Sequence, residues 1–275
     1  MKYSPKKITS GNNPLLKKIR SLKERQARQK TGLFLIEGVT LILEALEKGL
    51  KLEHLLVTEE YFADGLEAKL MEAIEGDEYL AAELATVPLS IFKELVTTQT
   101  PSPALAAAMM PIYTVEQISK LAPDTVLLCE NLQDPGNLGT IIRSALAFGA
   151  GALILSHGSV DAYNTKVVRS AMGALFALPI LSIDLVAAAQ VLKDAGYIFL
   201  AFSPEAPLSV SEYHFEEDKV VIMVGNEAAG LSLEAEDLAD ISLSIPQTNK
   251  IESLNVAVAT SIALYERSQV KYLRQ

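Results

Sequence analysis

Tryptophan is absent from the 275 residues, and aromatic side chains make up only 6% of them. Cysteine occurs once, at Cys129, so the chain forms no internal disulfide. The three histidines are scattered, and no Cys/His spacing typical of zinc occurs, so we expect no metal. The apolar runs are far shorter than a membrane span, and the N-terminus is basic rather than signal-like. These absences indicate a protein of the reducing cytoplasm without a membrane segment.

Charge is unevenly distributed along the chain. The formal net charge is −10, yet residues 1–30 hold ten basic side chains and one acidic one, so this end carries +9 and the remainder −19. Such asymmetry favours a nucleic-acid partner for the basic end. The alternative is a solvated basic helix face with no ligand.

The stretch 131–143 organises the second half of the chain. An apolar strand is predicted at 125–129 and a helix at 138–148, with Asn137 as the N-cap. The loop between them contains Asp, Pro, Gly and Asn, which are turn formers. The loop and the helix thus place an amide, a carboxylate and the guanidinium of Arg143 at the carboxyl end of a strand, where open α/β sheets bind ligands.

Two later stretches have the same build. An apolar strand at 220–224 precedes the glycine-containing stretch 225–231. A strand at 241–245 precedes the stretch 246–255, and a final helix is predicted from Ser253, its expected N-cap, to about residue 272.

In this order the three stretches closely resemble the signature motifs of the SpoU/TrmH class of RNA ribose 2′-O-methyltransferases. We call residues 131–143, 225–231 and 246–255 the first, second and third motifs. The resemblance covers about residues 125–270, with a looser match to the substrate-binding domain of the family near 10–110. It implies methyl transfer from S-adenosylmethionine (AdoMet) to a ribose 2′-hydroxyl of RNA, with ribosomal RNA as the expected substrate, and a homodimer.

Alternating strand and helix patterns predict an α/β fold. Residues 1–110 are expected to form a small substrate-binding domain with a basic helix at 13–29, and 111–123 a linker. Residues 124–275 are expected to form a doubly wound, mostly parallel sheet, with a helix at 165–176. The resemblance, and not the periodicity, adds a C-terminal trefoil knot.

Four residues are expected to carry catalysis. The resemblance assigns this role to Arg143, together with Asn131, Asn255 and Glu227. Because a guanidinium stays protonated in proteins, we expect Arg143 to grip a phosphate and stabilise the 2′-alkoxide rather than act as a base. Glu227 is expected to hold Arg143 or Asn131. The alternatives are a surface ion pair for Arg143, cap bonding for the asparagines and a solvated turn acid for Glu227.

The resemblance implies that AdoMet binds to seven residues that follow the strands. These are Phe202, Ser203, Gly225, Asn226, Ile245, Ser253 and Leu254. Gly225 is expected to allow close backbone approach, although an ordinary turn is the alternative. The third motif departs from the family pattern, because Gln247 and Asn249 stand where Met-x-Gly is common.

Basic residues of two segments are expected to bind RNA. These are Lys17, Lys18, Arg28, Lys166 and Arg169. Solvated amphipathic helices are the alternative. Small apolar residues of the final helix, Val256, Ala259 and Ala263, are expected to pack in the dimer.

The sequence argues against two other function classes. A catalytically silent RNA-binding or ribosome-assembly protein of the same fold is disfavoured, because Asn131, Arg143, Glu227 and Asn255 are all present. A nicotinamide-dependent enzyme is disfavoured, because no GxGxxG follows the first strand of the C-terminal domain.

Overall fold

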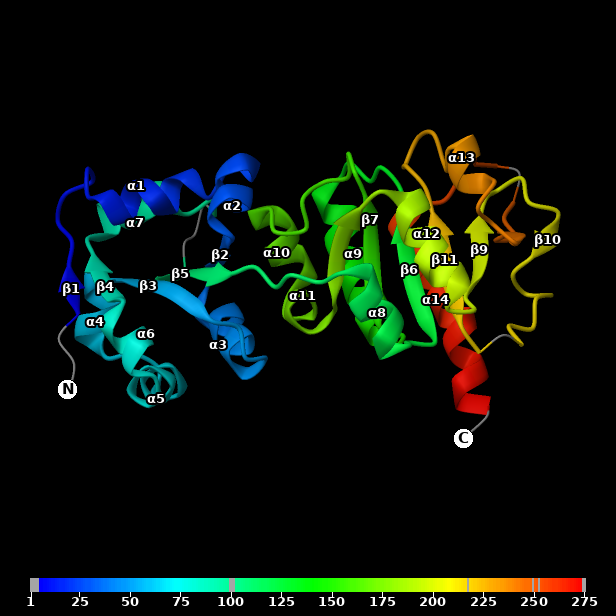
Figure 1. Ribbon diagram of the computed structural model, residues 1–275. Coiled ribbons are helices and arrows are strands. Elements are labelled where there is room, and N and C mark those ends of the chain that lie inside the picture. The colour runs from blue at the N-terminus through cyan, green and yellow to red at the C-terminus, as the bar shows by residue number, and fades with distance from the viewer. Residues whose placement is uncertain (1–4, 99–101, 217, 249, 252, 274–275) are drawn as a thin grey trace. The chain divides into compact units, whose positions relative to one another are not determined.

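The chain folds into two compact units. Figure 1 shows the computed structural model, which describes residues 5–98, 102–216, 218–248, 250–251 and 253–273. The first unit comprises Met1–Pro111 and Tyr163–Phe176, and the second comprises Ile112–Ala162 and Ala177–Gln275. Residues 163–176, which follow the first motif in sequence, thus pack with the N-terminal unit. There the Phe34 ring lies 4.8 Å from that of Tyr163.

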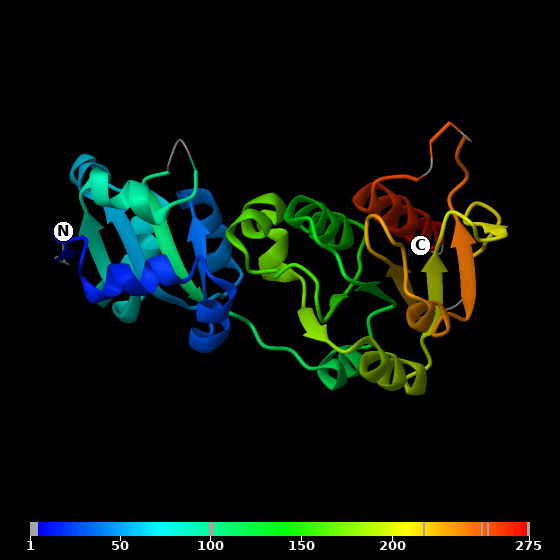
Figure 2. The ribbon, with the colours of Figure 1, turned by 90° about the horizontal axis from the view of Figure 1, so that it is seen from above.

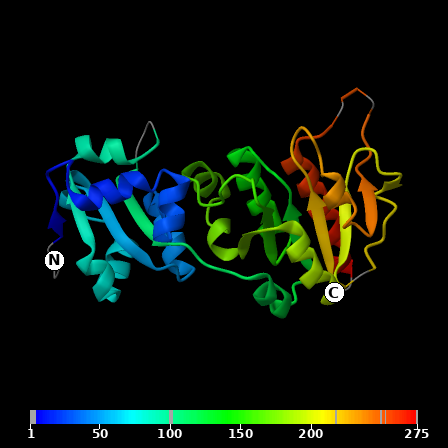
Figure 3. The ribbon, with the colours of Figure 1, turned by 45° about the horizontal axis from the view of Figure 1, so that its top comes forward.

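The first unit is built on a mixed five-stranded sheet. In spatial order its strands are β1 (Lys6–Lys7), β4 (Leu84–Val87), β3 (Leu52–Thr58), β5 (Ala104–Met109) and β2 (Leu33–Glu37). Strand β5 runs antiparallel to both neighbours, and the other pairs are parallel. Helices α1 (Pro14–Ser21) and α7 (Leu89–Leu95) lie on one face of it (Figure 3). Their residues Leu16, Ile19, Phe92 and Leu95 are buried in the core on that face.

Several elements of this unit differ from the prediction. The helix expected at 13–29 is two helices, α1 and α2 (Arg25–Thr31), because Glu24 is extended. Residues 59–74, whose sequence pattern predicts a single helix, likewise split at Gly65, whose φ is 95°. They form α4 (Glu59–Asp64) and α5 (Ala68–Gly76). Helices α3 (Val39–Glu47) and α6 (Glu78–Ala82) complete the unit together with α10 (Thr165–Ala171) and α11 (Ala174–Ala177). Met172, with φ 53°, separates the last two.

The second unit contains a fully parallel seven-stranded sheet. In spatial order its strands are β10 (Leu208–Ser209), β12 (Ile241–Ser244), β9 (Ile198–Phe202), β11 (Val220–Val224), β6 (Thr125–Cys129), β7 (Ala152–Ser156) and β8 (Ile180–Ile183). Every pairing in it is parallel. The chain moves outward from β6 to β8 and then returns to the other side of β6. The predicted α/β fold with a mostly parallel sheet is therefore confirmed.

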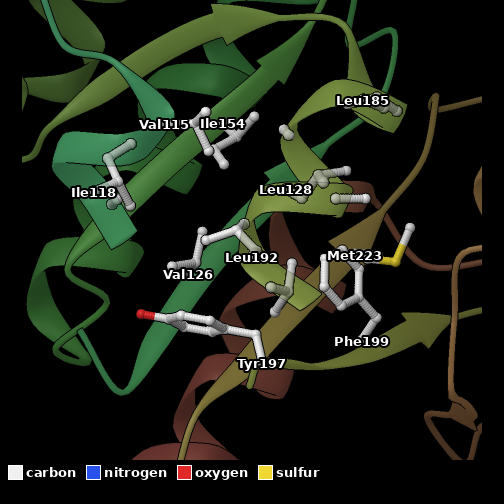
Figure 4. Packing of buried hydrophobic residues seen from close by; sticks show 14 of the residues in the cluster. Val115, Ile118, Val126, Leu128, Ile154, Leu185, Leu192, Tyr197, Phe199 and Met223 are labelled. Carbon is white, nitrogen blue, oxygen red and sulfur yellow. The ribbon is translucent and has the colours of Figure 1, made fainter. Parts of the chain in front are cut away.

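Helices cover both faces of this sheet (Figure 2). Helices α8 (Val115–Leu121) and α12 (Leu185–Asp194) lie on one face, and α9 (Pro135–Ala147) and α14 (Val256–Leu273) lie on the other. Val115 and Ile118 of α8 are buried against Val126, Leu192 and neighbouring core residues (Figure 4). The expected linker 111–123 therefore contributes a helix to this core.

Two helix caps require correction. Helix α9 begins at Pro135, not at residue 138, because Asp134 accepts the N–H groups of Gly136 (2.7 Å) and Asn137 (2.9 Å). Helix α14 begins at Val256, and Asn255, not Ser253, accepts its free N–H groups, those of Ala257 and Val258. In both helices the polar side chain adjoining the first helical residue is the cap. Helix α13 (Leu233–Glu236) completes the unit.

Candidate active site

The loop after β6 adopts a conformation that asparagine tolerates. Asn131 has φ 49°, in the left-handed region that Asn enters more readily than most residues. Its N–H donates to Ser156 Oγ (2.8 Å), and its carbonyl accepts from Asn226 Nδ2 (2.8 Å). Gln133 Nε2 donates to Asn131 Oδ1 (2.7 Å). The Asn131 side chain is exposed beside the cavity that β6, β7 and β8 border.

The Glu227 side chain binds backbone N–H groups of the first motif. Its carboxylate accepts the N–H of Asp134 (3.1 Å), that of Gln133 (3.2 Å) and Asn137 Nδ2 (3.1 Å). Burial raises the pKa of the Glu227 carboxyl, but these hydrogen bonds together outweigh burial, so its pKa lies below the ordinary value. Glu227 was expected to hold Arg143 or Asn131 directly. Instead the ionised carboxylate binds the loop between them.

Asn137 joins the three motifs. Its Nδ2 donates to Glu227 of the second motif, and its Oδ1 accepts from Asn255 Nδ2 of the third motif (3.0 Å). Asn255 Oδ1 in turn accepts the N–H of Ala257 (2.9 Å). These bonds tie the starts of α9 and α14 to the loop after β11. We call Glu227, Asn137 and Asn255 the motif junction.

Arg143 lies outside the motif junction. It is exposed on α9, and within the part of the chain that the structure describes its guanidinium has no hydrogen bond or ion pair. The surface ion pair, which was the alternative for this residue, is therefore not formed with any described residue. A guanidinium in this state is available to an anion from outside the chain.

All seven residues expected to bind the cofactor surround one cavity of about 740 Å³. It lies beyond the carboxyl ends of β9, β11 and β12, and Glu227 also lines it. Phe202, Ile245 and Leu254 supply apolar wall, while Ser203 and Ser253 are polar. Cavities of this size and mixed lining are typical of small-molecule sites. Asn249 lies outside the described residues.

Gly225 is required by the loop of the second motif itself. A Cβ at Gly225 would lie 2.0 Å from the carbonyl carbon of Gly230. The loop is closed by Asn226 N–H to the Gly230 carbonyl (2.8 Å) and by the reverse bond (3.0 Å). Close backbone approach therefore occurs at Gly225 as expected, but within the loop, where it shapes one wall of the cavity.

The residues expected to bind RNA fall into two groups, all within the first unit. Lys17 and Lys166 are exposed, whereas Lys18 lies 3.7 Å from Glu53 Oε1 and Arg169 is bound to Thr97 and Glu37. Several further basic residues of the N-terminal segment are paired with acids: Lys6 with Glu83, Lys7 with Glu59 and Arg20 with Glu94. The +9 charge of this segment is thus partly neutralised.

Arg28 was predicted wrongly as an RNA contact. Its side chain is buried, with only 2% of the residue exposed, and its guanidinium donates to the carbonyls of Leu22 (2.9 Å) and Lys23 (2.8 Å). These bonds satisfy the end of α1 and the turn into α2. Arg28 is a structural residue, because a buried guanidinium must be paired.

The residues assigned to dimer packing also require correction. Val256 and Ala263 are buried within the second unit, and Ala259 lines the 740 Å³ cavity. Among the residues of α14 whose burial is described, the exposed large apolar ones are instead Val258 and Tyr265, each 48% exposed. The helical register explains the error, since the apolar stripe of α14 faces its own sheet.

Asn137 was predicted as the N-cap of a helix, and its bonds to Glu227 and Asn255 were not predicted. The sequence carried no signal for these bonds, because both partners lie far along the chain. Gln133 was not predicted at all. Among the described residues no group of His, Cys, Asp or Glu is arranged to hold a metal ion. No helix found in those residues is both long and apolar enough to cross a membrane.

Comparison with known proteins identifies the family of this chain. The model of the SpoU rRNA Methylase family matches residues 124–265, and that of the MRM3-like substrate binding domain matches residues 13–106. The 23S rRNA (guanosine(2553)-2'-O)-methyltransferase RlmP of Bacillus subtilis (strain 168) is 34% identical over 260 residues, which cover 94% of this chain and 98% of that protein.

Solved structures are similar over nearly the whole chain. The crystal structure of an AdoMet-bound rRNA methyltransferase from Sinorhizobium meliloti has a TM-score of 0.86 and 28% identity, covering 96% of this chain and 97% of that one. The SpoU methyltransferase AviRb from Streptomyces viridochromogenes, in complex with AdoMet, gives a TM-score of 0.85 at 28% identity over 95% of this chain and 99% of that one. The family resemblance of the three motifs is confirmed, and this chain belongs to the SpoU rRNA methylase family.

Proposed function

We propose that this protein transfers the methyl group of AdoMet to a ribose 2′-hydroxyl of ribosomal RNA. The observation that carries the proposal is the motif junction beside the 740 Å³ cavity, because it joins all three motifs where a donor and an RNA ribose would meet. Holding two reactants in line is worth roughly 7–11 kcal/mol of the barrier. A rigid junction at this position serves that purpose.

The residues around the cavity fit AdoMet. The cofactor supplies a methyl group on a positively charged sulfonium. Phe202, Ile245 and Leu254 offer apolar surface for an adenosine group, while Glu205 and Glu236 offer carboxylates for the charged end. The buried side-chain oxygen of Gln247 has no hydrogen-bond partner among the described residues that line this cavity. These are the features of a site completed by a ligand with both apolar and polar groups.

Arg143 acts on the RNA in this proposal. Its exposed guanidinium binds a phosphate and stabilises the negative charge that develops on the 2′-oxygen. Because a guanidinium stays protonated in proteins, it is no proton acceptor, and the hydroxyl proton leaves to another group. Asn131, bonded through its backbone to Ser156 and Asn226, orients the ribose.

The proposal includes a C-terminal trefoil knot and a homodimer. Helices α9 and α14 pack side by side, and Phe148 meets Tyr265 edge-on at 5.8 Å. Leu146 (39% exposed), Val258 and Tyr265 (48% each) leave apolar surface on this helix pair that a second copy would cover. A cytoplasmic location is also proposed, and the free, buried thiol of Cys129 is consistent with a reducing compartment.

The test is a map of ribose methylation in total RNA from cells with the gene, without it, and without it but expressing Arg143→Ala. We expect one or a few rRNA positions to lose methylation in the second and third strains. An unchanged map in both strains refutes the proposal. A silent RNA-binding protein would leave the map unchanged and bind no AdoMet in calorimetry, which separates the two functions.

A further inference from the structure

Gln247 has a polar atom for which the described residues supply no partner. It follows β12 in the third motif and lines the 740 Å³ cavity. Its side-chain oxygen is buried and accepts no hydrogen bond from any residue that the structure describes. Of the described residues that bury such an unbonded side-chain oxygen, Gln247 is the one that lines this cavity. The position is also one where the sequence departs from the family pattern.

An unpaired buried acceptor is unfavourable, because it has lost its bonds to water and gained none. Most buried polar groups in proteins are bonded, and an exception at a binding cavity indicates a partner that arrives with the ligand. Gln247 can turn its terminal amide toward such a partner by side-chain rotation alone, because its torsions are free to adopt other staggered states.

We propose that Gln247 is a cofactor-binding residue whose side-chain oxygen accepts a hydrogen bond from the adenosine part of AdoMet. This rests on the proposed function. Two parts of the cofactor carry donors, namely the neutral adenine amine and ribose hydroxyls, and the charged ammonium of the methionine part. A cation is best matched by a carboxylate, and Glu205 and Glu236 line the same cavity. The neutral amide oxygen of Gln247 therefore receives a neutral donor.

Removing the acceptor of Gln247 should weaken cofactor binding without lowering the melting temperature of the free protein. Gln247→Met keeps the length and flexibility of the side chain but removes the acceptor. Without ligand, the variant should melt at the same temperature as the wild type or higher, since an unpaired buried oxygen is gone. With ligand, it should bind S-adenosylhomocysteine about 5- to 10-fold more weakly, the usual effect of losing one hydrogen bond.

The measurements are calorimetric titrations of the full chain with S-adenosylhomocysteine and with adenosine, together with thermal melts of the free protein. Adenosine should lose the same factor as S-adenosylhomocysteine, because both carry the donor. Gln247→Glu, which keeps an acceptor, should bind both within about 3-fold of the wild type. Gln190→Met on α12 is the matched control, since Gln190 is exposed and donates to Asp194 away from the cavity.

Three results would overturn the assignment. In the first, Gln247→Met binds both ligands as tightly as the wild type. In the second, weaker binding comes with a lower melting temperature of the free protein, which marks Gln247 as a support of the loop. In the third, S-adenosylhomocysteine loses affinity and adenosine does not, which moves the contact to the methionine part. A wild-type protein that binds neither AdoMet nor S-adenosylhomocysteine would instead refute the proposed function itself.

Discussion

Asn255 donates a hydrogen bond of 3.0 Å to Asn137, and this bond joins the first turn of α9 to the start of α14. The two residues are 118 positions apart in sequence. Asn137 also donates a hydrogen bond to Glu227, so the geometry of the first motif depends on both later motifs.

Asn137 and Asn255 should act as one unit in methyl transfer. We expect Asn137→Ala and Asn255→Ala each to lower kcat, and the double variant to lose much less than the product of the two losses. Coupling between bonded residues is typically about 0.5–3 kcal/mol. Single-turnover methylation of rRNA measures it. Independent, multiplicative losses would show that the junction does not position the reactants.

Arg143→Ala should abolish most methyl transfer while leaving the fold and AdoMet binding nearly intact. Loss of one charge-stabilising donor typically costs about 10²–10³ in rate, and the lost phosphate contact adds to it. Arg143→Lys should recover little, because ammonium lacks the planar fork, and it should keep the shape of the pH–rate profile. A rising limb moved toward the lysine pKa would instead indicate a base. Near-normal turnover by Arg143→Ala would remove this residue from the mechanism.

Glu227 should make the fold sensitive to acid. The pKa of the Glu227 carboxyl is lower in the folded protein than its ordinary value of 4.5, so the ionised carboxylate stabilises the fold above pH 4.5. This stabilisation is lost as the pH falls through the pKa that Glu227 has in the folded protein. We expect Glu227→Gln to melt below the wild type at pH 7 and the gap to close as the pH falls below 4.5. Glu234→Gln, an exposed acid on α13, controls for the loss of one negative charge. A gap that widens in acid would contradict the sign.

A substitution of Lys17 should affect RNA binding, whereas a substitution of Arg28 should affect the stability of the fold. Lys17→Glu reverses an exposed charge, so it should weaken RNA binding and flatten its salt dependence without changing the melting temperature. Arg28→Met should leave buried carbonyls unpaired and destabilise the first unit by about 1–3 kcal/mol or more. Filter binding at several salt concentrations and thermal melts measure the two effects. Equal RNA affinity and salt slope for Lys17→Glu would place the RNA surface elsewhere.

The helix pair α9 and α14 should hold the homodimer. We expect Val258→Glu and Tyr265→Glu to yield monomers in light scattering at micromolar concentration, because each buries a charge in the interface. Leu233→Glu is the matched control, since Leu233 is 79% exposed on α13. A wild-type monomer under the same conditions would refute the dimer.

Local sequence determined the central strands and the presence of the three motifs. Strands β6 and β11 have the predicted limits, because each is a short apolar run that is buried throughout its length. Strand β5 was not predicted, because its alanine-rich sequence lacks the β-branched residues that are typical of strands. It forms a strand because it pairs with β2 and β3.

The tertiary structure decided which polar side chains meet. Asp134 and Asn137 are both residue types that cap helices well. In the folded chain Pro135 is the first helical residue, so Asp134 is the N-cap. The side chain of Asn137 therefore binds Glu227 and Asn255 instead. Arg28 looks like its basic neighbours in the sequence, yet it is buried because the turn into α2 places its carbonyl partners around it. Local patterns determine secondary structure, whereas the bonds of a long polar side chain depend on distant residues that only the fold brings near.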